Sequence, residues 1–330
     1  MLEQRELGRG GPKLNPIGLG CMGLTAFYTP RVPEADAIKL VQEAIDLGVD
    51  HLDTAEMYTG NEEMLGKALA GRRERVFLAS KFGPVVDHST GYVTGEVDGS
   101  EANLRRAIEQ TLTRLKTDHV DLYYLHRPDR SRPIEETVGA MAKLVAEGKI
   151  RGIGFSEPSS ENIRRAAKVH PIAAVQSEYS IFTRAIEANV LPAIEEVGAS
   201  LVAYSPLGRG MLTGAFGRGR TLEANDARMT RMPRFVGAAG EANLALVGEV
   251  EAVAEARGVA PGQVALAWVL GRVPFAHVIP GTSKLANLKS NLGAADLSLT
   301  EAEIARLNQL ADKVQGTRYN EAGMKAIDTD

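Results

Sequence analysis

The segment Val49-Asp50-His51-Leu52-Asp53-Thr54-Ala55-Glu56-Met57-Tyr58 joins a short apolar run to a polar loop. We expect a buried strand that ends at Asp53, followed by a loop that carries Tyr58. A carboxylate at the end of a buried strand is costly unless it is paired. A tyrosine on the adjacent loop is a candidate proton donor, but its ordinary pKa of about 10 must first be lowered. A lysine beside both side chains would satisfy both requirements.

The next two apolar runs end in residues that suit this purpose. Val76–Ser80 leads directly to Lys81, and Val120–Leu125 leads directly to His126. Asp53, Lys81 and His126 would therefore stand at the ends of three successive strands, with Tyr58 on a loop beside them.

Strand and helix patterns alternate along the rest of the chain. Short apolar runs begin near residues 17, 49, 76, 120, 151, 173, 200 and 276. Helical patterns follow at 34–47, 62–70, 101–116, 135–147, 159–169, 187–198, 243–257 and 284–292. This alternation predicts an α/β protein with a parallel sheet, and the count is that of a (β/α)₈ TIM barrel. Active sites of such barrels lie at the carboxyl ends of the strands, where the predicted strand ends place these side chains.

Four further features accompany the barrel pattern. The glycines and prolines of residues 1–16 predict a small N-terminal β-hairpin, and a final helix near 301–313 precedes a polar tail. Two long loops, 83–100 and 208–240, break the rhythm, and long loops in compact domains are usually functional or disordered.

Length and composition narrow the class of protein. The chain has 330 residues, 44% of them hydrophobic, and a net charge of -4; we interpret residues 1–330 as a single barrel domain. Acidic and basic residues are interspersed, which argues against a nucleic-acid or membrane-surface partner, and no apolar run approaches the ~18 residues of a membrane span. The N-terminus lacks a signal-peptide core, and Cys21 is the only cysteine. We therefore predict a cytoplasmic location.

Several motifs resemble those of the aldo-keto reductase family, in particular its bacterial and plant branch that includes the perakine reductase-like enzymes. The segments that resemble catalytic motifs are Leu52–Tyr58, Ser80–Gly83 and Tyr124–Arg127. The segments that resemble cofactor motifs are Gly152–Glu157, Val175–Tyr179, Ala203–Gly208 and Ile279–Thr282. The similarity runs over nearly the whole chain, and this many motifs in order are highly specific.

The resemblance implies an NADPH-dependent oxidoreductase that reduces aldehyde or ketone carbonyls to alcohols. Tyr58 would give the proton, and Lys81, paired with Asp53, would lower the tyrosine's pKa. His126 would orient the carbonyl, and the nicotinamide would supply the hydride. The residues expected at the cofactor are Gly20, Met22, Ser156, Gln176, Tyr204, Ser205, Pro206, Leu207, Gly208, Gly210, Gly281, Thr282, Ser283, Lys284, Asn287 and Asn291. Those expected around the substrate are Phe27, Tyr28, Met57, Phe82 and Phe182.

The sequence departs from the family pattern near the expected 2′-phosphate of NADPH. Asn287 stands where many members carry an arginine, and Ser290 stands where many carry a glutamate. Lys284 and Asn291 remain in place, so one positive charge would favour NADPH over NADH with less margin. In the substrate pocket, Phe182 replaces the tryptophan that is usual in the close branch.

Other interpretations stay open at this stage. The Asp53 and Lys81 side chains could form a merely structural ion pair. The chain could be a cofactor-binding regulatory subunit, like the potassium-channel β subunits of the same fold. A metal-dependent hydrolase using His51 and Asp53 is a third possibility, although barrel filling is the better interpretation of His51. No Gly-x-Gly-x-x-Gly opens a helix after the first strand, which argues against a Rossmann fold. The arginines of the second long loop, Arg209, Arg218, Arg220 and Arg228, are expected on a solvated loop face.

Overall fold

The computed structural model describes residues 4–28, 30–87, 92–216, 219 and 221–328. Within them, eight parallel strands form one sheet in the order β12-β11-β10-β9-β8-β5-β4-β3. The strands are β3 (Leu19–Gly20), β4 (His51–Asp53), β5 (Phe77–Phe82), β8 (Val120–Leu125), β9 (Ile150–Ser156), β10 (Ala174–Glu178), β11 (Ser200–Tyr204) and β12 (Ala276–Val278). Each coincides with a predicted apolar run.

Backbone hydrogen bonds join the two outer strands of this sheet. The amide of Gly18 donates to the carbonyl oxygen of Val278 at 2.9 Å, and the amide of Val278 donates to that of Pro16 at 2.8 Å. The sheet therefore closes on itself, and the predicted (β/α)₈ barrel is confirmed.

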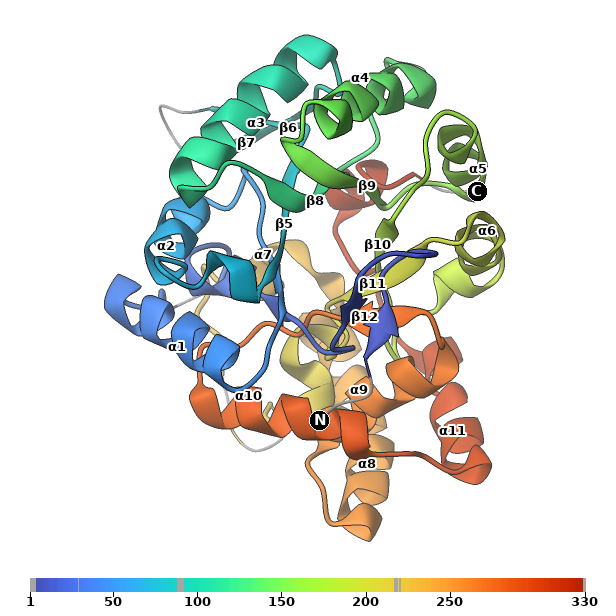
Figure 1. The fold of residues 1–330 in the computed structure, drawn as a ribbon. Helices are drawn as coiled ribbons and strands as arrows, with labels where there is room; N and C mark the ends of the chain where they lie inside the picture. The colour runs from blue at the N-terminus through green and yellow to red at the C-terminus, as the bar shows by residue number, and fades with distance from the viewer. Residues whose placement is uncertain (1–3, 29, 88–91, 217–218, 220, 329–330) are drawn as a thin grey trace.

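Helices surround the barrel (Figure 1). Those next to it are α1 (Glu34–Asp46), α2 (Asn61–Ala68), α3 (Glu101–Leu115), α4 (Ile134–Ala146), α5 (Ser160–Ala167), α6 (Val190–Val197), α9 (Pro261–Arg272) and α10 (Leu285–Leu292). The others are α7 (Ala227–Arg231), α8 (Gly237–Arg257), α11 (Glu301–Asn308) and α12 (Glu321–Lys325). No helix of the described residues is both long and apolar enough to cross a membrane.

Helix α9 corrects the predicted element order. The sequence pattern places only a helix at 243–257 before the last strand, whereas α9 follows α8 and packs against β12. Every residue from Val264 to Leu270 is buried. A helix that is apolar all round has no amphipathic period, and this is why the pattern did not reveal it.

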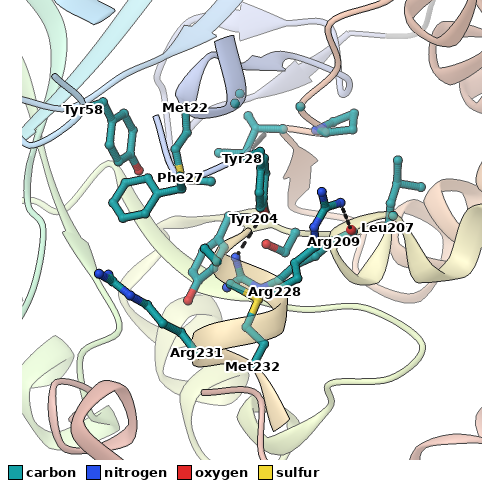
Figure 2. A pocket seen from close by; sticks show the side chains of 18 of the residues that line it. Met22, Phe27, Tyr28, Tyr58, Tyr204, Leu207, Arg209, Arg228, Arg231 and Met232 are labelled. Carbon is teal, nitrogen blue, oxygen red and sulfur yellow. Dashed lines mark hydrogen bonds between the residues drawn. The ribbon is translucent and has the colours of Figure 1, made fainter. Parts of the chain in front are cut away.

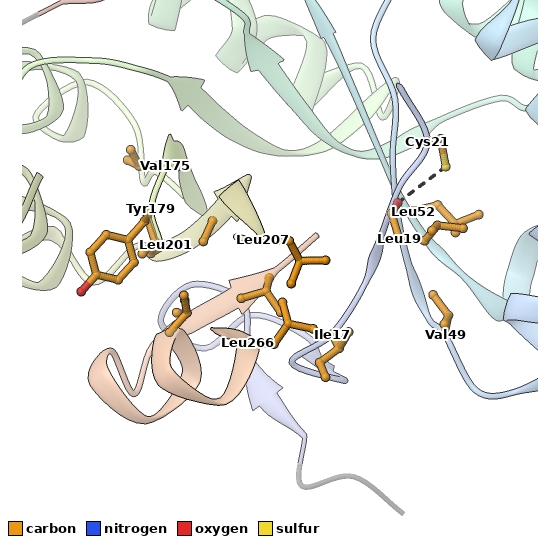
Figure 3. Packing of buried hydrophobic residues seen from close by; sticks show 14 of the residues in the cluster. Ile17, Leu19, Cys21, Val49, Leu52, Val175, Tyr179, Leu201, Leu207 and Leu266 are labelled. Atoms are coloured by element: carbon orange, nitrogen blue, oxygen red, sulfur yellow. Dashed lines mark hydrogen bonds between the residues drawn. The ribbon is translucent and has the colours of Figure 1, made fainter. Parts of the chain in front are cut away.

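Buried side chains form two layers, one inside the barrel and one outside. Leu122 and Tyr124 point into the barrel, and Tyr123 and Leu125 belong to the outer layer, as the two-residue period of a strand requires. Gly154 makes room for the inner layer, because a Cβ atom there would lie 2.5 Å from the Tyr124 ring. In the outer layer, the strand side chains of Val175 and Leu201 belong to the same buried cluster as Leu266 of α9 (Figure 3).

The predicted N-terminal hairpin consists of β1 (Arg5–Glu6) and β2 (Lys13–Leu14). Leu7 and Leu14 belong to the inner layer of buried side chains, so the hairpin covers the end of the barrel opposite the strand carboxyl ends. The hairpin therefore leaves the end at the strand carboxyl termini open for a functional site.

The two long loops and the tail contain more regular structure than their composition indicates. The first loop includes an antiparallel pair, β6 (Pro84–Asp87) and β7 (Tyr92–Val97), and the second includes α7 and the start of α8. The polar tail folds back over the barrel and includes α12 (Figure 1), and its Asp328 side chain accepts a hydrogen bond from Asn162 of α5.

His51, inside the barrel, makes stability depend on pH. Neither ring nitrogen has a hydrogen-bond partner among the described residues, and burial, reinforced by His277, lowers the pKa of His51 to about 3. The folded protein keeps His51 neutral, whereas the unfolded chain takes up a proton as the pH falls through about 6.5. The linkage therefore costs stability as the pH falls, by about 2 kcal/mol between pH 7 and pH 5.

We expect His51→Leu to remove about that much of the pH dependence of the free energy of unfolding. The measurement is urea unfolding at pH 7 and pH 5, with the more exposed His170→Leu as the control. An equal loss of stability on acidification in wild type and His51→Leu would contradict the prediction.

Candidate active site

Four side chains predicted from the sequence meet at the carboxyl end of the barrel. Asp53 ends β4, Lys81 lies in β5, His126 directly follows β8, and Tyr58 lies on the loop after β4. Lys81 Nζ donates to Asp53 Oδ1 at 2.5 Å and to the carbonyl oxygen of Thr54 at 2.8 Å. The Tyr58 hydroxyl lies 3.5 Å from His126 Nε2, and Lys81 Nζ lies 5.4 Å from the centre of the Tyr58 ring. The cation of the ion pair thus lies over the ring of Tyr58.

Burial decides the protonation states of this group. Burial raises the pKa of Tyr58 well above its ordinary value, and the Asp53 carboxylate raises it further. Burial lowers the pKa of His126 well below its ordinary value, and Lys81 and Arg127 add to that shift. At neutral pH the phenol therefore carries its proton and the imidazole is uncharged.

The direction of the Tyr58 shift corrects the sequence interpretation. The sequence interpretation has Lys81 lower this pKa, whereas burial and the Asp53 carboxylate, with which Lys81 is paired, raise it. Arg127 and Arg209 lower the pKa of Tyr58 against the larger effect of burial.

A cavity of ≈ 1570 Å³ opens above the tetrad. Asp53, Tyr58 and His126 line it, whereas Lys81 is fully buried beneath it. The cavity runs on to the N-terminus of α10, and it exceeds the roughly 300–1,000 Å³ of ordinary small-molecule sites. It has room for a dinucleotide together with a substrate.

The residues predicted to hold the cofactor line this cavity with one exception. Gly20, Met22, Ser156, Gln176, Tyr204, Ser205, Pro206, Leu207, Gly210, Gly281, Thr282, Ser283, Lys284, Asn287 and Asn291 all face it. Gly208 does not, and a Cβ atom there would face the side chains of Leu212 and Met211.

Two of these residues already contact the tetrad or its neighbour. Gln176 Nε2 donates to Asp53 Oδ2 at 2.7 Å, and Ser156 Oγ accepts from Arg127 Nη1 at 3.1 Å.

The loop after β11 adopts unusual backbone angles, with positive φ at Ser205 (50°) and Arg209 (56°). Strained backbone of this kind is found where a loop is shaped for a ligand.

The predicted substrate residues divide into two groups. Phe27, Tyr28 and Met57 line the cavity. Phe82 and Phe182 do not and are corrections: both are buried in the outer hydrophobic layer, and Phe82 stacks on Tyr123 with ring centres 5.3 Å apart. Figure 2 shows Phe27 and Tyr58 together on one side of the cavity and Tyr204 with the loop arginines on the other.

The arginines of the second long loop are also corrected. Arg209 and Arg228, expected on a solvated face, are buried ion-pair partners: Arg209 Nη2 donates to Glu178 at 2.9 Å, and Arg228 Nη2 to Asp226 at 2.7 Å. Burying a guanidinium is tolerable when a carboxylate is supplied, and loop composition did not reveal those carboxylates. Arg218 and Arg220 lie outside the described residues.

Sequence reasoning also missed the part that the tail plays. Arg318 pairs with Glu157 at 2.5 Å, and the Tyr319 hydroxyl lies 3.0 Å from that of Tyr204. Asp328 fastens the end of the tail, since its carboxylate accepts from the backbone amide of Ser159 at 3.1 Å. The available signal was the run of polar and aromatic residues after the last predicted helix.

The metal alternative finds no ligand set in the parts of the chain that the structure describes. His51 and Asp53 point into the barrel, but no three histidine, cysteine or carboxylate side chains are grouped there as metal ligands. Cys21 is buried and not bonded to another cysteine.

Comparison with known proteins identifies the family. The model of the Aldo/keto reductase family matches residues 16–312. A curated relative, probable aldo-keto reductase 1 of Glycine max, is 40% identical over 321 residues, which is 96% of this chain and 91% of the relative.

Two solved structures have a similar overall fold. The glycerol dehydrogenase AKR11B4 from Gluconobacter oxydans has a TM-score of 0.84 and 30% identity, covering 95% of this chain and 96% of its own. The aldo-keto reductase AKR11C1 from Bacillus halodurans has a TM-score of 0.76 and 28% identity, covering 98% and 99%. The chain therefore belongs to the aldo/keto reductase family, a family of oxidoreductases that use nicotinamide cofactors.

Proposed function

We propose that this protein is an NADPH-dependent reductase that converts aldehydes or ketones to alcohols, with Tyr58 as the proton donor. The observation that carries the proposal is the Tyr58 hydroxyl at the cavity wall, 3.5 Å from His126 Nε2. A carbonyl oxygen between these two groups would accept the phenolic proton as negative charge develops on it.

The other tetrad residues hold this geometry. The Lys81–Asp53 pair fixes the strand ends behind the phenol, and Gln176 holds the second oxygen of the Asp53 carboxylate. When bound, the cofactor supplies the hydride. We assign its carboxamide to Ser156 and Gln176, and the face of its nicotinamide ring to Tyr204.

The chemistry of the lining residues fits such a cofactor along the whole cavity. The loop from Ser205 to Gly210 offers a backbone path for the pyrophosphate, and Lys284 precedes the N-terminus of α10. A helix N-terminus and a lysine together suit a phosphate. We further propose that residues 1–330 act as one domain in the cytoplasm on a small carbonyl substrate.

The first experiment is a panel of aldehydes and ketones assayed by the oxidation of NADPH and of NADH. Turnover with a preference for NADPH would support the proposal. Tight NADPH binding without turnover of any carbonyl would instead support the regulatory-subunit alternative.

We expect Lys284→Ala to weaken NADPH binding about 10- to 100-fold, the scale of a charged hydrogen bond, while NADH binding changes little. The reason is that Lys284 is exposed beside the cavity and only NADPH carries the 2′-phosphate. Quenching of protein fluorescence measures both affinities.

Lys289→Ala is the matched control, because Lys289 lies in α10, the helix that Lys284 precedes, but does not line the cavity. Equal losses of NADPH and NADH affinity in Lys284→Ala would show that Lys284 supports the loop rather than reading the phosphate.

A further inference from the structure

The cations around the cavity differ in how their charge is balanced. Most of them contact a carboxylate directly. The pairs are Lys81 with Asp53, Arg209 with Glu178, Arg228 with Asp226, and Arg318 with Glu157.

Arg127 is different, because it forms no ion pair with a carboxylate of the described residues. Its Nη1 atom donates to the carbonyl oxygen of His126 at 2.7 Å and to Ser156 Oγ at 3.1 Å, both neutral acceptors. Glu157 is the carboxylate whose charge acts on Arg127, but both of its carboxylate oxygens are bonded to Arg318, at 3.0 and 2.5 Å.

The free edge of this guanidinium is available to a ligand. Arg127 lines the cavity, and within the described part of the chain its Nε and Nη2 atoms make no hydrogen bond. Arginine stays charged at any physiological pH, and an unpaired cation that is partly buried is unfavourable. Nε and Nη2 together form the planar fork that binds a carboxylate through two parallel hydrogen bonds.

Its position places this charge at the reacting end of the cavity. Arg127 directly follows His126, and its Nη1 is anchored on Ser156 at the end of β9. Its charge also reaches Tyr58, whose pKa it lowers against the effect of burial. A group bound to Arg127 would therefore lie near a carbonyl held by Tyr58 and His126.

We propose that Arg127 is a binding subsite for a carboxylate on the substrate, so that the preferred substrates are short oxo acids whose aldehyde or ketone lies a few bonds from the carboxylate. This inference rests on the proposed carbonyl reduction and adds the class of substrate to it.

Arg231 is the alternative anion subsite and supplies a control. It lies in α7 and lines the same cavity, below Tyr58 in the view of Figure 2. Arg231 is exposed to solvent, where a cation needs no partner, and so it gives no reason to expect a bound carboxylate.

The test compares kcat/KM for 4-oxobutanoate and for butanal, which share a four-carbon chain and an aldehyde but differ in the carboxylate. With saturating NADPH, we expect the wild-type enzyme to favour 4-oxobutanoate at least about 10-fold. Arg127→Met should cost 4-oxobutanoate about 10- to 100-fold more than it costs butanal, mainly through KM. Arg127→Lys should recover part of the preference, and Arg231→Met should retain it.

Three results would overturn the inference. One is a wild-type enzyme that reduces butanal and 4-oxobutanoate equally well. Another is an equal loss for both substrates in Arg127→Met, which would place Arg127 in the shared chemistry. The third is a preference that disappears in Arg231→Met and survives in Arg127→Met. Failure to reduce either aldehyde would differ from all three, because it would overturn the reductase proposal itself and this inference with it.

Discussion

Tyr58→Phe is expected to lower kcat/KM for carbonyl reduction by about 10²–10⁴-fold, the usual contribution of a general acid. The substitution removes only the hydroxyl oxygen, which lies 3.5 Å from His126 Nε2 at the base of the cavity. Because burial and Asp53 raise the pKa of Tyr58, this phenol keeps its proton at neutral pH. The proton is therefore available at the moment when the carbonyl oxygen becomes negative.

The measurement separates loss of chemistry from loss of binding. Fluorescence titration should give a nearly unchanged affinity for NADPH, since the ring that shapes the cavity remains. Tyr123→Phe is the matched control, because Tyr123 belongs to β8 but packs in the outer layer against Phe82. A Tyr58→Phe enzyme with near wild-type turnover of its best aldehyde would exclude Tyr58 as the proton donor.

The strands and the tetrad could be predicted because both depend on local sequence. Each strand of the barrel is a short apolar run. Strands of a parallel sheet are covered by side chains on both faces, so they appear in the sequence as continuous apolar segments that can be found without knowing their neighbours. Asp53, Lys81 and His126 stand at the ends of such runs, so the fold brings them together once the strands are placed. The recognition of the family followed from the same segments.

What the sequence did not show depends on contacts between distant residues. Phe82 and Phe182 are aromatic residues of the kind that lines a substrate pocket. The packing of neighbouring strands and helices nevertheless buries both in the core. Arg209 lies in a loop whose glycines and arginines are typical of a solvated segment. Its buried partner, Glu178, is 31 positions away in the sequence. Pairings of this kind are decided by the tertiary structure and leave no periodic signal.

Arg127 illustrates the same limit in the opposite direction. The sequence places it beside His126, where any arginine would be expected to find a carboxylate. Only the structure shows that Arg318 of the distant tail has taken Glu157. The free charge at Arg127 is therefore a property of the assembled site.

The Lys81–Asp53 pair is expected to carry the largest stability effect in the site. Lys81→Met should lower the free energy of unfolding by about 3–5 kcal/mol, because it leaves the Asp53 carboxylate buried without its cation. The two side chains are 0% and 4% exposed, so solvent cannot replace the lost partner. Urea unfolding at pH 7 measures the loss.

Two control variants test whether the loss of stability comes from the buried charge of Asp53. Lys67 and Glu34 form a pair with a similar 2.6 Å contact, but these side chains are 48% and 54% exposed, so Lys67→Met should cost less than about 1 kcal/mol. The double variant Lys81→Met with Asp53→Asn removes both charges and should recover part of the stability lost in the single variant. Equal losses in Lys81→Met and Lys67→Met would mean that solvent reaches Asp53. The pair would then be too weak to hold the strand ends behind Tyr58.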